Sequence, residues 1–104
     1  MDIPAGSYVV IFANRLKPDH PGYKEMAQQM MDMVEKQPGF QGAVSLREGL
    51  DGVTISYWES KEAIATWREV PEHLQAQQSG QSQWYDHYDL QVCKVEDARG
   101  FSAG

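Results

Sequence analysis

The sequence has one cysteine, few basic residues and no long apolar run, and each shortage excludes a class of protein. With Cys93 as its only cysteine, the chain has no internal disulfide. No stretch approaches the roughly 20 apolar residues that a transmembrane helix needs. Residues 1–7 lack the basic segment and apolar block of a secretory signal. We therefore expect a cytoplasmic protein that is not inserted in a membrane.

Basic side chains are too few and too scattered for a nucleic-acid-binding surface. The chain has 9 Lys and Arg against 15 Asp and Glu, which gives a net charge of −6. Phosphate contacts need clustered Lys and Arg, and no such cluster occurs along the chain. We expect no nucleic-acid partner, and we attribute the acidic balance to solubility.

Motifs for phosphate binding, a serine nucleophile or a metal are also missing. There is no glycine-rich phosphate loop and no nucleophile elbow. The three histidines lack metal-ligand spacing: His20, His73 and His87. Asp86, His87 and Asp89 are close in sequence and are predicted to form a solvated loop, because exposed Asp and His are the normal case. Cys93 is predicted to be a small buried hydrophobe and not a nucleophile.

The 104 residues predict one α+β domain, with its core over about residues 7–96 and a C-terminal tail over 97–104. Four segments have the alternation, or the β-branched and aromatic content, of strands: 7–15, 40–48, 53–59 and 89–96. Residues 49–52 contain two glycines and predict a hairpin turn between the second and third strands.

Two helices are predicted between these strands. Apolar residues spaced by three and four predict the first over 21–37, with Asp19 as its N-cap. Ser60 is a good N-cap for the second helix. Pro71 cannot continue the hydrogen-bond ladder, so this helix is expected to break there and to restart. Residues 81–88 are predicted to be a helical turn or a loop.

The order β-α-β-β-α-β is the split βαβ pattern of ferredoxin-like domains, a four-stranded antiparallel sheet with both helices on one face. The first strand is apolar on both of its faces. We expect the later strands to add apolar side chains to the uncovered face, namely Trp58, Cys93 and Val95, with Tyr57 and Val92 on the opposite side. A soluble monomer rarely exposes such a face, so the sequence predicts a homodimer that packs sheet to sheet. The alternative is a monomer whose tail, with Phe101, covers the face.

Several motifs sit at defined places in this pattern. Asn14 lies late in the first strand, and Pro38-Gly39-Phe40 follows the first helix. The third strand ends in Tyr57-Trp58-Glu59-Ser60, and Trp67 lies in the second helix, ahead of Pro71-Glu72-His73. From about Ser7 to Val95 the chain resembles the antibiotic-biosynthesis-monooxygenase (ABM) domain family. The resemblance implies a ferredoxin-like fold that dimerises into a dimeric α+β barrel.

The resemblance also implies an oxidoreductase: a cofactor-independent monooxygenase that uses O₂ to oxidise a small aromatic substrate such as a phenol, hydroquinone or anthrone. Known oxygenases of the family use an Asn and a Trp, which match Asn14 and Trp67 here. His73 is the best candidate base, because the pKa of a histidine lies near working pH. We expect four aromatic side chains to bind the substrate: Phe12, Tyr57, Trp58 and Tyr85.

Alternatives stay open at this point. The haem-degrading branch of the family carries an iron-ligating histidine ten residues after the Trp, and here that residue is Gln77, a poor haem ligand. His73 could take its place only if the helix break at Pro71 turns this residue inward. Haem is therefore possible but disfavoured, and we expect no cofactor. A non-catalytic dimeric module that binds a small ligand is the third hypothesis. In the simpler interpretations Asn14 bonds to backbone or water, and Trp67 is a core residue.

Overall fold

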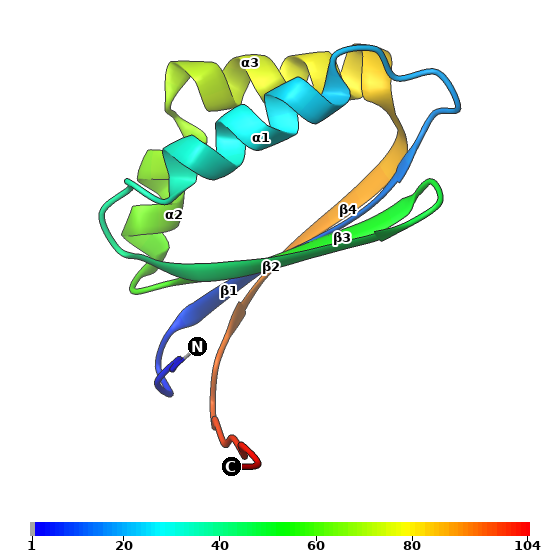
Figure 1. Cartoon of the computed structure of the whole chain (residues 1–104). Helices are drawn as coiled ribbons and strands as arrows, with labels where there is room; N and C mark the ends of the chain where they lie inside the picture. The colour runs from blue at the N-terminus through cyan, green and yellow to red at the C-terminus, as the bar shows by residue number, and fades with distance from the viewer. Residues whose placement is uncertain (1) are drawn as a thin grey trace.

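The computed structural model describes residues 2–104 and shows a four-stranded sheet with all helices on one face (Figure 1). The α+β ferredoxin-like order β-α-β-β-α-β is confirmed, with the second helix in two pieces. The elements are β1 (Tyr8–Leu16), α1 (Tyr23–Val34), β2 (Phe40–Glu48), β3 (Asp51–Trp58), α2 (Lys61–Arg68), α3 (Pro71–Ser79), the π-helix η1 (Gly80–Trp84) and β4 (Tyr85–Lys94).

The strands pair in the order β2-β3-β1-β4, and every pair is antiparallel. β1 therefore runs between β3 and β4. Side chains of residues directly opposite each other lie on the same face of a sheet. We call the face toward the helices the inner face and the other the outer face. Tyr8 pairs with Trp58, and six residues further along β1 Asn14 pairs with Gly52 and Tyr88, so all of these lie on the inner face.

The hydrophobic core lies at one end of the inner face, where α1 and α2 cover Trp58. Its fully buried members are Val34, Trp58, Ile64 and Trp67. Trp58 is only 1% exposed, and its indole N–H donates to Ser56 Oγ at 2.9 Å. Half-buried Met30, Met31 and Met33 of α1 pack against this cluster. The methionines thus fill the core, as expected of flexible apolar side chains.

The predicted helix signals are partly confirmed. Ser60 caps α2 by accepting a hydrogen bond from Ala63 N at 3.1 Å, and α3 begins at Pro71. Asp19 does not cap α1, because that helix begins later than predicted. Its N-cap is Gly22, with a left-handed φ of 81°.

The Pro38-Gly39-Phe40 turn brings the end of α1 against the start of α2. Gly39 has a φ of 82°, which favours glycine. A Cβ at this position would lie 2.7 Å from the Cβ of Ala63, too close for any side chain. The carbonyl of Gly39 accepts a hydrogen bond from Glu59 N at 2.7 Å. The glycine is required here both by its backbone angle and by the close approach of α2.

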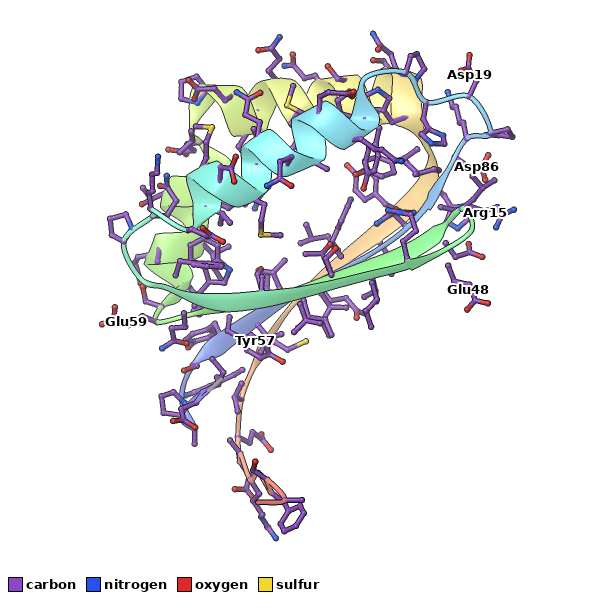
Figure 2. All side chains as sticks on the ribbon, in the orientation of Figure 1. Arg15, Asp19, Glu48, Tyr57, Glu59 and Asp86 are labelled. Carbon is purple, nitrogen blue, oxygen red and sulfur yellow. The ribbon has the colours of Figure 1, made fainter. Side chains whose placement is uncertain are left out.

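The predicted faces of Trp58 and Tyr57 were both wrong, because the two residues are exchanged. Trp58 shares the inner face with Val92, whereas Tyr57 and Cys93 are both paired with Val9 and lie on the outer face (Figure 2). On the inner face Trp58 packs against Val34 of α1 and against Ile64 and Trp67 of α2. The prediction of a buried Cys93 was also wrong for a single chain, in which this residue is exposed because no element covers the outer face of β4.

β4 begins at Tyr85, four residues earlier than predicted, and follows directly on the π-helix. The register with β1 shifts between Arg15 and Leu16, because Leu16 pairs with Tyr85 and Arg15 with His87. Asp86 is thus an extra residue that forms a β-bulge. The predicted helical turn is confirmed for residues 81–84, which belong to the π-helix, and the bulge disrupts the alternation of side chains that would have indicated a strand from Tyr85.

The outer face is apolar and is uncovered in a single chain. Its central row contains Ile11, Ile55 and Val44, and Leu46 at the edge is 67% exposed. The tail after β4 extends away from the helices (Figure 1), and its Phe101 is 92% exposed. Within residues 2–104, none of the helices has the length and apolar character needed to span a bilayer.

Candidate functional site

Asn14 lies in a row of four residues that crosses the inner face of the sheet, one from each strand. The row runs from Arg47 on β2 through Gly52 on β3 and Asn14 on β1 to Tyr88 on β4. The row thus places a guanidinium, a glycine without a side chain, an amide and a phenol side by side. Asn14 is only 6% exposed, whereas Arg47 and Tyr88 are accessible to solvent.

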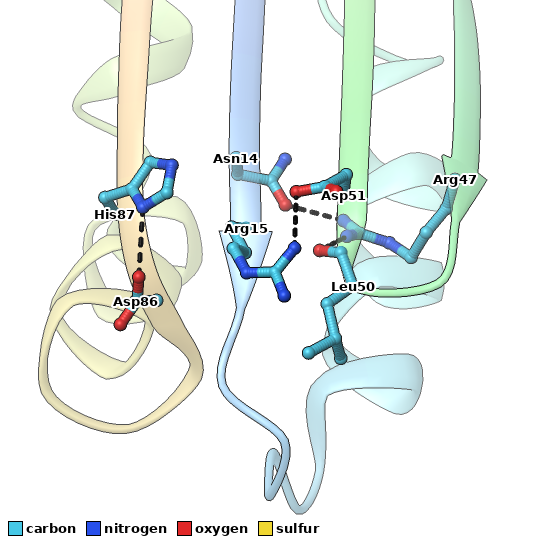
Figure 3. A network of polar contacts seen from close by, with 7 residues as sticks. All are labelled: Asn14, Arg15, Arg47, Leu50, Asp51, Asp86 and His87. Atoms are coloured by element: carbon cyan, nitrogen blue, oxygen red, sulfur yellow. Dashed lines mark hydrogen bonds and ion pairs between the residues drawn. The ribbon is translucent and has the colours of Figure 1, made fainter.

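The side chain of Arg47 lies over Gly52 to reach Asn14 (Figure 3). A Cβ at Gly52 would lie 2.5 Å from the guanidinium carbon of Arg47. Gly52 does not have a positive φ, so its backbone angle suits other residues as well. A glycine at this position is needed for space, because any side chain would occupy the place of the guanidinium.

Three hydrogen bonds hold the guanidinium of Arg47. Its Nη2 donates to Asn14 Oδ1 at 2.7 Å and to the Tyr23 hydroxyl at 3.0 Å, and its Nη1 donates to Leu50 O at 2.9 Å. Arginine has no acceptor, so Asn14 must turn its oxygen toward Arg47. The amide nitrogen of Asn14 then points away from Arg47, and it has no hydrogen-bond partner within residues 2–104. Asn14 thus presents an N–H donor that a cation polarises.

Aromatic rings from four elements gather beside Asn14. Phe12 of β1 contacts Tyr85 and Tyr88 at centroid distances of 5.4 and 5.2 Å. Tyr23 of α1 meets Tyr85 edge-on at 5.9 Å and Trp84 at 5.8 Å. The Trp84 indole N–H donates to Pro21 O at 2.8 Å, which ties the π-helix to the start of α1. We call these five rings the aromatic wall, which lies next to the row from Arg47 to Tyr88: Phe12, Tyr23, Trp84, Tyr85 and Tyr88.

Tyr85 is the most strongly perturbed ionisable group in this wall. Burial raises the pKa of the Tyr85 phenol far above its ordinary value, and the neighbouring Tyr23 hydroxyl raises it further. Tyr85 is therefore a neutral phenol throughout the physiological pH range. It is available as a hydrogen-bond donor, but it is a poor base.

Trp67 and His73 form a separate pair at the core end of the inner face. Their rings stack at a centroid distance of 4.3 Å with 16° between the planes. His73 Nδ1 lies 3.0 Å from Trp67 O. A carbonyl only accepts, so Nδ1 carries the proton and Nε2 keeps a lone pair. The helix break at Pro71 thus turns His73 inward, onto Trp67.

The environment of His73 favours its neutral form. Burial lowers the pKa of His73 below its ordinary value of 6.5, and the nearby charge of Arg68 lowers it too, against the opposing effect of the bond to Trp67 O. At neutral pH the imidazole is uncharged, and its Nε2 is free to accept a proton.

The structure does not bring all predicted site residues together. Phe12, Asn14 and Tyr85 lie at one end of the inner face, and Trp67 and His73 at the other. The Cα atoms of Tyr8, at the core end of β1, and Asn14 are separated by about 20 Å at the rise of a β-strand. Trp58 is a core residue and Tyr57 lies on the outer face (Figure 2), so these two neighbours do not line one pocket.

Two of the hollows on the surface formed by residues 2–104 are wide and open, and neither of these lies between β1 and α2. One of about 460 Å³ is at the β2–β3 hairpin and includes Arg47, Asp51 and Gly52. The other, of about 510 Å³, lies between the Pro38-Gly39 turn and the start of α2. Within residues 2–104, no three His, Cys, Asp or Glu side chains are grouped closely enough to hold a metal ion.

Sequence analysis missed Arg47, Tyr23, Trp84 and Tyr88. A signal for Arg47 was present in the hairpin. A two-residue turn at Gly49-Leu50 fixes the register that places Arg47 opposite Gly52. Nothing in the sequence reveals that Tyr23, at the start of α1, reaches the same guanidinium.

Comparisons with known proteins agree with this architecture. Residues 7–79 match the family described as antibiotic biosynthesis monooxygenase (ABM). The uncharacterized protein YqjZ of Bacillus subtilis (strain 168) is 42% identical over 95 residues, which cover 90% of this chain and 83% of YqjZ.

Solved structures with little sequence identity share the fold. Rv0793 from Mycobacterium tuberculosis superposes with a TM-score of 0.80 at 15% identity, over 90% of this chain and 99% of that one. SnoaB, a cofactor-independent oxygenase from Streptomyces nogalater, superposes with a TM-score of 0.74 at 16% identity, over 93% and 97% of the two chains. The match over residues 7–79 and the similarity to YqjZ show that this chain belongs to the antibiotic biosynthesis monooxygenase family.

Proposed function

We propose that this protein is a cofactor-independent monooxygenase that oxidises an electron-rich aromatic substrate with O₂ and works as a homodimer. The observation that carries the proposal is the amide of Asn14, which Arg47 orients and polarises beside an aromatic wall. Membership of the family and the shared fold of the oxygenase SnoaB support the reaction class.

The reaction balances without an external reductant. An anthrone-like CH₂ group loses a proton, and the anion passes one electron to O₂. The two radicals combine to a peroxide, which takes up a proton. The second C–H proton then leaves as the O–O bond breaks. One oxygen departs as water and the other stays as the quinone carbonyl, so the substrate supplies all four electrons.

Asn14 acts on the first step of this sequence. Loss of the first proton leaves negative charge on the substrate oxygen, and the N–H of Asn14 donates to it. Such a donor is effective because it is already oriented before the charge develops. Phe12 and Tyr85 are placed to hold the ring by edge and face contacts.

Trp67 and His73 form the second part of the proposal. His73 accepts the proton at Nε2, and the stack with Trp67 holds its ring in place. Because this pair lies toward the other end of β1, an anthrone bound at Asn14 does not reach it directly, and the role of His73 is therefore tested separately from that of Asn14.

An oxygen electrode tests the reaction with an anthrone as substrate. We expect Asn14→Ala to lower turnover by about 10²–10³-fold, the usual effect of removing one oxyanion donor. Ser45→Ala is the matched control, because it removes only a neighbouring hydrogen bond to Thr54 on the same face. Full turnover in Asn14→Ala would show that the site is assigned wrongly, and Trp67→Phe and His73→Gln test the second part separately.

Haem does not enter this proposal. Gln77 has no imidazole, and its amide donates to Arg68 O at 3.5 Å, so the residue at this position does not fit haem iron. A saturable Soret shift on addition of haemin, one per subunit, would favour the haem alternative. Ligand binding without oxygen uptake would favour the non-catalytic one.

The proposed dimer packs one outer face on another. The apolar row of Ile11, Ile55 and Val44 supports it, because a soluble monomer rarely exposes such a surface. Light scattering after gel filtration measures the mass in solution. We expect Leu46→Glu to yield monomers, and Leu74→Glu on α3, which is also exposed, to leave the dimer intact. A monomeric parent protein at high concentration would contradict the proposal.

A further inference from the structure

We propose that Arg47 is an anion-recognition residue and that the ligand of this site is an aromatic molecule bearing a carboxylate or another anionic oxygen. This inference rests on the proposed function for the location of the site, and it adds the chemical class of the ligand. It stands on four features of Arg47: its charge, its unpaired donors, its fixed position and its neighbours.

The charge of Arg47 has no partner within residues 2–104. Ion pairs in this part of the chain join Arg15 to Asp51, His87 to Asp86 and Arg99 to Asp97. Asp51, an acidic residue of the same hairpin, is already paired with Arg15 at 2.9 Å. Arg68 and the five lysines also lack an ion pair within residues 2–104, and Arg47 differs from them in being held by three hydrogen bonds to neutral groups. An incoming anion would supply the missing charge.

Arg47 also keeps hydrogen-bonding capacity. A guanidinium has five N–H donors, and three of them are used by Asn14, Tyr23 and Leu50. The other two have no partner among the described residues. The unused donors are Nε–H and one Nη1–H, and because both N–H groups of Nη2 are taken, an anion would accept these two donors singly and not as a parallel pair.

The guanidinium is held in place before any ligand arrives. Its three bonds reach strand β1, the β2–β3 turn and helix α1, and it also lies over the Tyr23 ring at 5.3 Å from the centroid. Gly52 beneath it leaves the space that it occupies. A long flexible side chain normally loses entropy on binding, and this arrangement reduces that loss.

The surroundings of Arg47 select an aromatic anion over a simple one. Tyr23, Tyr85 and Tyr88 lie along the same row or next to it. On the inner face of β4, Leu90 and Val92 continue this apolar surface and are about half exposed. An inorganic anion would use the charge but would leave this surface in water. A fused-ring acid would cover it.

The test is calorimetric binding of 1-hydroxy-2-naphthoate and of its methyl ester, without oxygen so that no turnover occurs. The two probes share the ring and the phenol and differ in one negative charge. A charge-assisted hydrogen bond contributes about 1.5–3 kcal/mol, so we expect the acid to bind at least about 10-fold more tightly than the ester.

Two variants assign this preference to Arg47. Arg47→Met removes the charge and keeps most of the side-chain volume, and Gly52→Ala displaces the guanidinium without changing it. Both are expected to abolish the preference for the acid. Arg15→Met is the matched control, because this exposed arginine on the outer face is paired with Asp51, and it should leave the preference unchanged.

Each outcome supports or overturns the inference. Equal affinity for acid and ester, no saturable binding of the acid up to millimolar concentration, or a preference that survives in both Arg47→Met and Gly52→Ala would overturn it. Its failure differs from that of the proposed function. Turnover of a neutral anthrone without any preference for the acid would support the proposed oxygenase and overturn anion recognition by Arg47. Preferential binding of the acid without oxygen uptake would support anion recognition and contradict the proposed oxygenase.

Discussion

The two ends of the inner face differ in what covers them, although they belong to the same strands. At the core end Trp58 is 1% exposed beneath α1 and α2. At the other end Arg47 and Tyr88 are accessible, and the only fully buried side chain of their row is the amide of Asn14. One end holds close-packed apolar side chains, and the other holds a cation, an amide and phenols.

This difference indicates that one end of the inner face contributes mainly to stability and the other mainly to binding. Apolar burial near Trp58 supplies the stability, so the row from Arg47 to Tyr88 can keep polar groups that contribute little to folding. Local features that favour binding often lower stability, and a separate core tolerates them. We therefore expect substitutions near Trp58 to change the free energy of unfolding, and substitutions in the row from Arg47 to Tyr88 to change binding and turnover.

Trp58→Ala is expected to have the largest effect on stability. Removing a fully buried tryptophan leaves a cavity in the core and lowers the free energy of unfolding by about 3–5 kcal/mol. Tyr88→Ala, at the exposed end, should lower it by much less. Urea denaturation of both variants measures the difference, and equal losses would contradict the division between the ends.

A pair of glycine variants sharpens the same comparison. Gly39→Ala forces a side chain into a left-handed backbone and against Ala63, and we expect a loss of about 2 kcal/mol or more in the free energy of unfolding. Gly52→Ala meets only the flexible tip of Arg47, so its loss should stay below about 1 kcal/mol. Denaturation midpoints that fall in the reverse order would show that Arg47 is part of the stable core.

Ser60→Ala tests the start of α2, which holds Ile64 and Trp67 on the core. Losing the hydrogen bond from Ala63 N to the Ser60 hydroxyl should lower the free energy of unfolding by about 1 kcal/mol. Ser60→Asp keeps an N-cap acceptor and should restore most of it. A loss in Ser60→Asp equal to that in Ser60→Ala would mean that the cap contributes little.

The smallest expected effect is a dependence on pH through His73. The pKa of His73 is lowered in the folded protein, so below its ordinary value of 6.5 the unfolded chain binds the proton more readily. Stability should therefore fall as the pH falls below about 6.5. Melting temperatures at pH 7 and pH 5.5 measure it, and His73→Phe, which can still stack on Trp67, should fall less. An equal fall in both proteins would count against a lowered pKa.

The sequence predicted the fold well because the fold depends on strong local signals. The alternation of strands, the cap at Ser60 and the break at Pro71 were all confirmed. The face of Trp58 was predicted wrongly, since alternation shows that Tyr57 and Trp58 point in opposite directions but not which one meets the helices. That choice depends on the packing of α2.

The candidate site was less accessible to prediction. Asn14 was named from the sequence, and its place late in β1 needed only the strand pattern. Its partners Arg47 and Tyr23 are 33 and 9 residues away along the chain and belong to other elements. The contacts of Arg47 with Asn14 and Tyr23 depend on the register of the sheet and on the space above Gly52, and neither can be derived from the alternation of residues within one strand.

The bulge at Asp86 has a consequence for how the aromatic wall can change. Tyr85 and Tyr88 are three positions apart, so in an uninterrupted strand they would point to opposite sides. The one extra residue turns both phenols inward. Deleting a single codon there would rotate Tyr85 away and remove one ring from the site without replacing any aromatic residue. The length of this segment, and not only its composition, therefore determines how many rings a ligand meets.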